Sequence, residues 1–258
     1  MWPGYGSNRG MRLRSRAAVA AGVAAALIGG AVLVDTAAAS RAESALSERT
    51  EADTRLSTAP DVYIAGFPFS QVAVTKEVPR VSVSTLDVDV AGLGVVNTGA
   101  EAFDIEVPVE RAAEGDFVGS PAAMVRRKVR LDGVAFGELL GMTDLDIANP
   151  YDISPGGGVA SEAQLTGTVP GTEKPSTVIV TLRLDGGTFR MRPSLLVDIP
   201  SGAEDEVLAA YTLDRDTRDL PLGGPADIVQ LSGGSIEFIR QRYNVVLDES
   251  DLAPLPPQ

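Results

Sequence analysis

The stretch TVIVTLRLDGGTFRMRPSLLV, residues 177–197, decides the fold class because it contains two alternating segments joined by a tight turn. Every second residue of each segment is apolar, which is the period of a β-strand with one face in the core. The apolar positions are Val178, Val180, Leu182 and Leu184, followed by Phe189, Met191, Pro193, Leu195 and Val197. The Asp-Gly-Gly sequence between them is typical of a hairpin turn. The stretch therefore predicts a pair of antiparallel strands.

Three other segments show the same alternation. Residues 103–110, FDIEVPVE, predict a strand with one exposed face, and residues 125–131 begin another. In residues 81–90 the apolar positions change phase near Thr85. A change of phase is typical of a β-bulge, so this segment predicts a long strand that bends.

Short helices interrupt the expected strands. We expect them at residues 135–142 and 204–213, the second behind a capping box of Ser201 and Glu204. The order of these elements predicts an α+β fold, with a long curved antiparallel sheet and a few helices.

The N-terminus has the pattern of an export signal. Four arginines between residues 9 and 16 precede the uncharged run of residues 17–34, and three alanines follow at 37–39. The run would span roughly 27 Å as a helix, against a bilayer core of about 30 Å, so it could also remain as an anchor. We therefore expect residues 1–39 to be a signal peptide or a membrane anchor, with the rest of the chain exported.

The remaining chain predicts one domain and a short tail. Residues 40–56 predict a surface helix that begins at a capping box of Ser40 and Glu43. Residues 40–251 are long enough for a single domain with a sizeable core. Residues 252–258 are rich in proline and are expected to form a loose tail.

Composition excludes several kinds of chemistry. The chain has no Cys and no His, which excludes disulfides, a Ser-His-Asp triad and a His or Cys zinc site. We expect no enzyme activity, cofactor or metal, although a hydrolase that needs only two carboxylates stays an alternative. The net charge of −13 argues against nucleic acid as a partner. The basic cluster at residues 126–130 could contact an anionic headgroup or form the exposed face of a strand.

The segment DVYIAGFPFSQ, residues 61–71, is the most distinctive internal motif. Phe67 and Phe69 flank Pro68 and could insert into lipid, form the lip of a pocket, or lie in the core.

With the arginine- and alanine-rich leader and the acidic helix, this segment resembles the actinobacterial LmeA family of cell-envelope phospholipid-binding proteins. The family motif GFPFLTQ has one residue more before the glutamine. Residues 219–236, with DLPLG and a Gly-Gly turn, are similar to the closing hairpin of the family. Between these two motifs, residues 129–140 are similar to a weaker strand-then-helix pattern of the family.

The resemblance implies a curved sheet wrapped against a helix around an elongated apolar cavity, as in tubular lipid-binding proteins. It implies phospholipid and the outer face of the plasma membrane as partners, and one family member is implicated in mannan elongation. The function expected from it is an exported envelope protein that binds acyl chains and supports envelope lipid or glycan assembly. A non-catalytic, membrane-anchored structural or adaptor ectodomain is the alternative, and the oligomeric state is left open. Candidate lining residues, each of which could instead be ordinary core, are Phe67, Phe69, Phe103, Phe136, Leu139, Leu140 and Met142.

Overall fold

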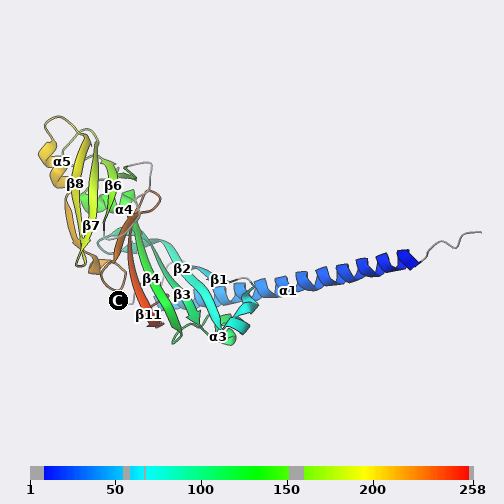
Figure 1. Cartoon of the computed structure of the whole chain (residues 1–258). Helices are drawn as coiled ribbons and strands as arrows, with labels where there is room; N and C mark the ends of the chain where they lie inside the picture. The colour runs from blue at the N-terminus through cyan, green and yellow to red at the C-terminus, as the bar shows by residue number, and fades with distance from the viewer. Residues whose placement is uncertain (1–8, 55–58, 67, 151–159, 256–258) are drawn as a thin grey trace, which may run out of the picture.

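The computed structural model describes residues 9–54, 59–66, 68–150 and 160–255, apart from the side chains of residues 9–25, 27, 28, 52–54 and 160. Within these ranges the chain forms a long N-terminal helix, several short helices and two antiparallel sheets (Figure 1). This architecture confirms the predicted α+β class with antiparallel strands. The strands divide into two sheets, whereas the sequence suggested one long sheet.

Sheet A has the strand order β1-β2-β3-β4-β11-β10, and sheet B has the order β5-β6-β7-β8-β9. The strands of sheet A are β1 (Asp61–Ala65), β2 (Glu77–Val90), β3 (Gly94–Glu106), β4 (Pro121–Leu131), β10 (Ile228–Leu231) and β11 (Ile236–Val246). Those of sheet B are β5 (Asp146–Ala148), β6 (Ala160–Gly167), β7 (Ser176–Asp185), β8 (Thr188–Asp198) and β9 (Leu213–Asp216). The helices are α1 (Arg9–Thr54), α2 (Val72–Thr75), α3 (Val109–Ala113), α4 (Gly133–Leu140) and α5 (Glu204–Ala210), with 3-10 turns η1 (Phe69–Gln71) and η2 (Thr217–Asp219).

The hairpin of β7 and β8 forms as predicted. Asp185 pairs with Thr188 across a two-residue turn in which Gly186 and Gly187 have φ values of 57° and 92°. Positive φ at both central positions matches the twist of the flanking strands, and glycine adopts it without steric cost.

The predicted bulge in the first long strand is also confirmed. The pairing of β2 with β3 shifts register between Thr85 and Val88, and Asp87 has a φ of 55°. The Oδ1 atom of Asn97 accepts a hydrogen bond of 3.0 Å from the Asp87 N–H, which holds the extra residue in place. Because a bulge increases twist and bends the strand, the two ends of sheet A face different neighbours.

The helix α1 is continuous through residue 40, so the predicted helix start at Ser40 is wrong. No proline occurs between residues 9 and 54, and alanine, the best helix former, is frequent in this region. A capping box cannot begin a helix where the preceding residues are already helical. Two residues of the predicted helix, Ala42 and Leu46, are buried against sheet A.

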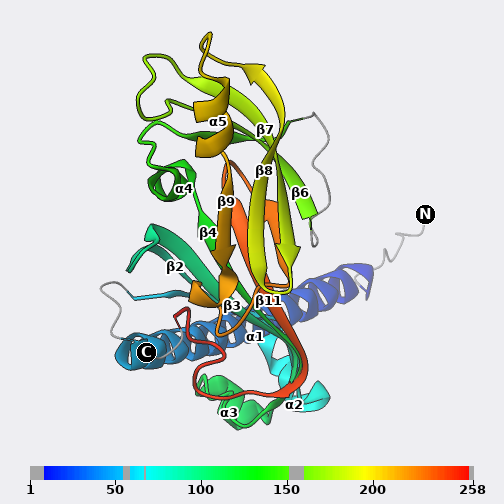
Figure 2. The same cartoon turned by 90° about the vertical axis from the view of Figure 1, so that its left-hand side faces the viewer.

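The C-terminal half of α1 crosses sheet A at the end remote from sheet B, and the N-terminal half projects away from both sheets (Figures 1 and 2). The Asp35 carboxylate accepts hydrogen bonds from the N–H groups of Phe69 and Ser70, each 2.6 Å long. Among the described residues, no helix combines the length and apolar character needed to cross a membrane. For much of the uncharged run at residues 17–34, the side chains lie outside the part of the chain that the structure describes.

The Asp35 contact gives a stability prediction that depends on pH. The hydrogen bond from the Ser70 N–H is the main cause that lowers the pKa of Asp35 below its ordinary value of 3.8. A lowered pKa stabilises the fold above the unfolded value, and this contribution is lost as the pH falls through the folded value. We expect Asp35→Asn to lower the thermal midpoint at pH 7, and the difference from wild type to shrink below pH 3.8 in circular dichroism melts. A difference that stays constant with pH would contradict this origin.

Two apolar cores stabilise the fold. One lies between sheet A and sheet B beneath α4, and the other lies between sheet A and α1. Leu252 and Ala253 are buried, at 7% and 5% exposure, so this part of the predicted loose tail is packed against the domain.

The helix α5 ends at residue 210, earlier than expected, and no side chain caps it, so the predicted capping box of Ser201 and Glu204 does not form.

Candidate functional site

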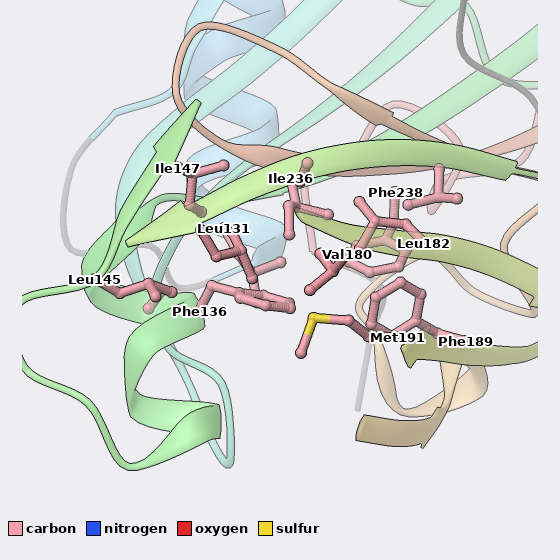
Figure 3. Close-up of a cluster of buried hydrophobic side chains, with 14 of the residues drawn as sticks. Leu131, Phe136, Leu145, Ile147, Val180, Leu182, Phe189, Met191, Ile236 and Phe238 are labelled. Carbon is pink, nitrogen blue, oxygen red and sulfur yellow. The ribbon is translucent and has the colours of Figure 1, made fainter. Parts of the chain in front are cut away.

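The largest apolar layer of the molecule lies between the two sheets, and we call it the seam. Its side chains come from β4 and β11 of sheet A, from β7 and β8 of sheet B, and from α4 and the residues that follow it (Figure 3). The seam is defined by Leu131, Phe136, Leu145, Ile147, Val180, Leu182, Phe189, Met191, Ile236 and Phe238, all less than 9% exposed. The two sheets also meet directly, because β10 lies beside β6.

Phe189 lies between two other aromatic rings of the seam. Its ring is nearly perpendicular to those of Phe136 and Phe238, at centroid distances of 6.3 and 4.9 Å. Edge-to-face pairs of this kind add about 0.5–1.5 kcal/mol to the burial of the rings. The three rings therefore tie α4, sheet B and sheet A together.

The helix α4 is positioned by caps at both ends. The Asp132 side chain accepts hydrogen bonds of 3.0 and 2.9 Å from the N–H groups of Val134 and Ala135, and Gly141 ends the helix with a φ of 73°. A Cβ atom on Gly133 would lie 2.1 Å from the Leu145 carbonyl oxygen, so only glycine allows this close approach. The predicted helix at residues 135–142 is present but begins and ends two residues earlier.

A small opening lies at the edge of the seam. A cavity of about 10 Å³ lies between α4, β8, β9 and η2, with Leu139, Leu213 and Asp216 on its more exposed side. A second cavity of about 60 Å³ lies between α1 and residues 247–252. Ligand pockets are typically about 300–1,000 Å³. Neither cavity is large enough for an acyl chain, so the expected hollow interior is not found at these two places among the described residues.

The structure brings together four of the seven candidate lining residues. Phe136 and Met142 are buried in the core that contains the seam, at 1% and 2% exposure, and Leu139 and Leu140 pack against it. Phe69 is 3% exposed in the other core, beneath α1. Phe67 lies outside the described residues.

Phe103 lies on the outer face of sheet A. The predicted alternation placed it with Ile105, but the backbone of Asp104 has a φ of 49°, which shifts the alternation so that only Ile105 points inward. The Phe103 ring lies 5.2 Å from the guanidinium carbon of Arg126, in a cation–π contact. Phe103 therefore does not contribute to the seam.

Most of the basic cluster at residues 126–130 lies on the outer face of β4, where Arg126, Lys128 and Arg130 are half-buried. Arg126 and Lys128 each lie 3.7 Å from Glu101, and Arg130 lies 3.5 Å from Glu237. Arg127 points to the opposite face and is 6% exposed. The sequence indicates this inward orientation, because Arg127 occupies the same alternate positions as the apolar residues of β4. The sequence analysis missed it because it treated the four basic residues as one group.

Comparison with known proteins agrees with the resemblance of the motifs. The model of the LmeA-like phospholipid-binding family matches residues 33–239, a range that extends from the part of α1 holding Asp35 to β11. No curated protein and no solved structure matches the chain. In the described part of the chain, no group of three or more acidic side chains could hold a metal ion. Since the matched range covers most of the 258 residues, the chain belongs to the LmeA-like phospholipid-binding family.

Proposed function

We propose that this protein binds phospholipid without catalysis, by taking acyl chains into the seam between sheet A and sheet B. The observation that carries the proposal is the small apolar cavity beside α4, where the seam approaches the surface next to Leu139 and Leu213. The lining of the cavity is largely aliphatic and aromatic, and the family described as phospholipid-binding supplies the ligand class.

Entry of an acyl chain requires the layers of the seam to part. Each CH₂ group transferred from water into an apolar layer contributes about 0.8 kcal/mol, so a long chain gains enough to offset the separation of packed side chains. The helix α4 is the element placed to move, because it is short and covers the seam from one side (Figure 2). Its displacement would enlarge the cavity without breaking the hydrogen bonds of either sheet.

A tryptophan at the entrance tests this route. We expect Leu139→Trp to reduce uptake of phosphatidylglycerol from vesicles at least about fivefold, because overpacking costs roughly 1–3 kcal/mol and 1.4 kcal/mol is tenfold in affinity. Val134→Trp is the matched control, since Val134 lies on the same helix but is 65% exposed. Protein-bound lipid is measured by native mass spectrometry after removal of the vesicles. Equal uptake by both variants and the wild type would contradict entry beside α4.

The tight packing of the seam favours a second candidate function. A non-catalytic structural or adaptor protein at the membrane needs no cavity, and the two cavities of about 10 and 60 Å³ fit such a role. The same vesicle experiment separates the two functions. A wild-type chain that takes up no phospholipid would support the adaptor and exclude the lipid carrier.

We propose that the protein acts outside the plasma membrane, where it supports envelope lipid or glycan assembly. The basic, apolar and alanine-rich order of residues 9–39 supports export. The hydrogen bonds of Asp35 with residues 69 and 70 favour retention of this part of α1 in the mature protein over its removal with a signal peptide. N-terminal sequencing of the protein from the envelope fraction tests both points. A mature terminus at Ser40 would contradict retention, and absence from that fraction would contradict export.

A further inference from the structure

Arg127 is a buried cation in the middle of β4. Only 6% of its surface is exposed, and it shares its face of the strand with the buried Val125 and Val129. Its Nη2 atom donates a hydrogen bond to the Ala253 carbonyl oxygen, but its Nε–H has no hydrogen-bond partner among the described residues. A buried donor without a partner costs free energy, so an arginine at this position calls for an explanation.

Two further arginines reach the same face from β11. Arg240 and Arg242 are in phase with the buried Phe238, and Arg240 is the register partner of Arg127. The Nη1 atoms of Arg127 and Arg240 lie 3.2 and 3.3 Å from the position that a Cβ atom on Gly223 would occupy. The guanidinium groups of Arg127 and Arg240 therefore converge on one small volume. Arg242 is close enough for its charge to act on Arg127, and we call Arg127, Arg240 and Arg242 the arginine cluster.

The positive charge of the arginine cluster is only partly neutralised. Among the described residues, the one carboxylate within 4.0 Å of these guanidinium groups is that of Asp251, which pairs with Arg242. Burial is the main cause that lowers the pKa of Arg127 to about 10, and the charges of the other two arginines add to it, while Asp248 acts in the opposite direction. A chain with a net charge of −13 thus holds a local excess of positive charge, with Arg127 buried and Arg240 and Arg242 half-buried.

The C-terminal segment, residues 248–255, covers the arginine cluster. Asp251 is 2% exposed, and its second carboxylate oxygen accepts a hydrogen bond of 3.1 Å from the Asp248 N–H. The Ala253 carbonyl oxygen faces Arg127. The Nη1 atom of Arg240 donates instead to the carbonyl oxygens of Leu222 and Gly223. Together with the one carboxylate and one carbonyl oxygen of the segment, these acceptors are still fewer than three guanidinium groups can use.

We propose that the arginine cluster binds the phosphate group of a phospholipid, and that Asp251 occupies this position until the lipid displaces the C-terminal segment. The inference rests on the proposed lipid-binding function and adds the headgroup site to it. Arg240, Arg242 and Asp251 lie beyond the matched range of residues 33–239, so the assignment stands on the geometry of the cluster.

A phosphate group fits the arginine cluster both in its chemistry and in its position relative to the seam. The planar fork of a guanidinium group matches two phosphate oxygens, and three such groups can satisfy the non-bridging oxygens of one headgroup. Arg240 also lies next to the seam, since Phe238, which lines its cavity, is two residues away on the same face of β11. That spacing is about 7 Å, so a phosphate at the cluster leaves its acyl chains close to the seam.

The test compares three soluble probes on the full chain by calorimetry, namely dioctanoyl phosphatidic acid, dioctanoylglycerol and inorganic phosphate. We expect the wild type to bind the phosphatidic acid at least about tenfold more tightly than dioctanoylglycerol, since charged hydrogen bonds of about 1.5–3 kcal/mol are each worth tenfold or more. Arg240→Gln, at a half-buried position, should lose this preference. Arg126→Gln removes the same charge from the opposite face of the sheet and should keep it.

A second variant separates phosphate binding from a structural role. Asp251→Asn removes the competing carboxylate and should tighten binding of the phosphatidic acid, while lowering the thermal midpoint of the lipid-free chain. An arginine cluster that only fastens the C-terminal segment would lose stability in this variant without any gain in affinity, which would overturn the proposal.

The remaining outcomes are distinct. Equal binding of the two lipids, or a preference that survives Arg240→Gln, overturns the headgroup site and leaves lipid binding in the seam intact. Binding of inorganic phosphate as tight as that of the phosphatidic acid identifies free phosphate as the ligand and overturns the lipid assignment. No binding of either lipid to the wild type overturns both the headgroup site and the proposed function.

Discussion

Phe69→Asp is expected to unfold the protein, with a loss of at least about 4–5 kcal/mol in the free energy of unfolding. Phe69 is 3% exposed in the core beneath α1, and removal of a buried phenylalanine alone costs about 3–5 kcal/mol. The new carboxylate would be buried in an apolar core and close to Asp35, whose carboxylate already binds the Phe69 N–H. Urea unfolding followed by circular dichroism measures the loss.

Phe103→Asp is the matched control, because Phe103 was predicted for the same role and lies on the outer face of sheet A. The variant loses the cation–π contact with Arg126, worth about 0.5–1 kcal/mol, and gains a carboxylate close to that arginine. We expect its unfolding midpoint to stay near that of the wild type. A Phe69→Asp protein as stable as Phe103→Asp would show that position 69 is not part of the core.

Phe189→Ala is expected to cost about 3–5 kcal/mol of stability, because it removes the central ring of the seam. Phe189 is 1% exposed and meets Phe136 and Phe238 edge to face, so its removal leaves a cavity bounded by three elements. Sheet hydrogen bonds and the α4 caps limit how far these elements can move to close it.

Leu195→Ala provides the comparison for this variant, since Leu195 lies on the same strand and is 56% exposed. We expect a loss below about 1 kcal/mol there, as for other surface substitutions. Both values come from urea denaturation, with the slope of the transition checked for two-state behaviour. A loss at Phe189 as small as that at Leu195 would mean that the two sheets do not depend on the aromatic contacts for their association.

Local alternation predicted the strands and their turns well. The Gly-Gly turn of β7 and β8 and the bulge of β2 follow from residues close together in the sequence, so the sequence alone contained them. The division into two sheets depends on pairings such as β4 with β11, which are about a hundred residues apart. Alternation identifies the buried face of a strand but not the strand that it pairs with.

The candidate site was predicted less well, for identifiable reasons. Phe136, Leu139, Leu140 and Met142 share one short helix and its end, so a single correct element placed all four near the seam. Phe103 was misplaced by the positive φ at Asp104, which the residue pattern does not show. The inward orientation of Arg127 was visible in its phase but conflicted with the expectation that arginines face water.

The central claim is that acyl chains of a phospholipid enter the seam, and photochemical labelling tests it most directly. A phosphatidylglycerol with a diazirine in the middle of one acyl chain is incubated with the full chain, illuminated, and its attachment sites are mapped by peptide mass spectrometry. We predict one lipid per chain, attached to residues of α4, β8, β9 and β11 that line the seam. Labelling confined to exposed residues of α1, or no labelling at all, would contradict the claim.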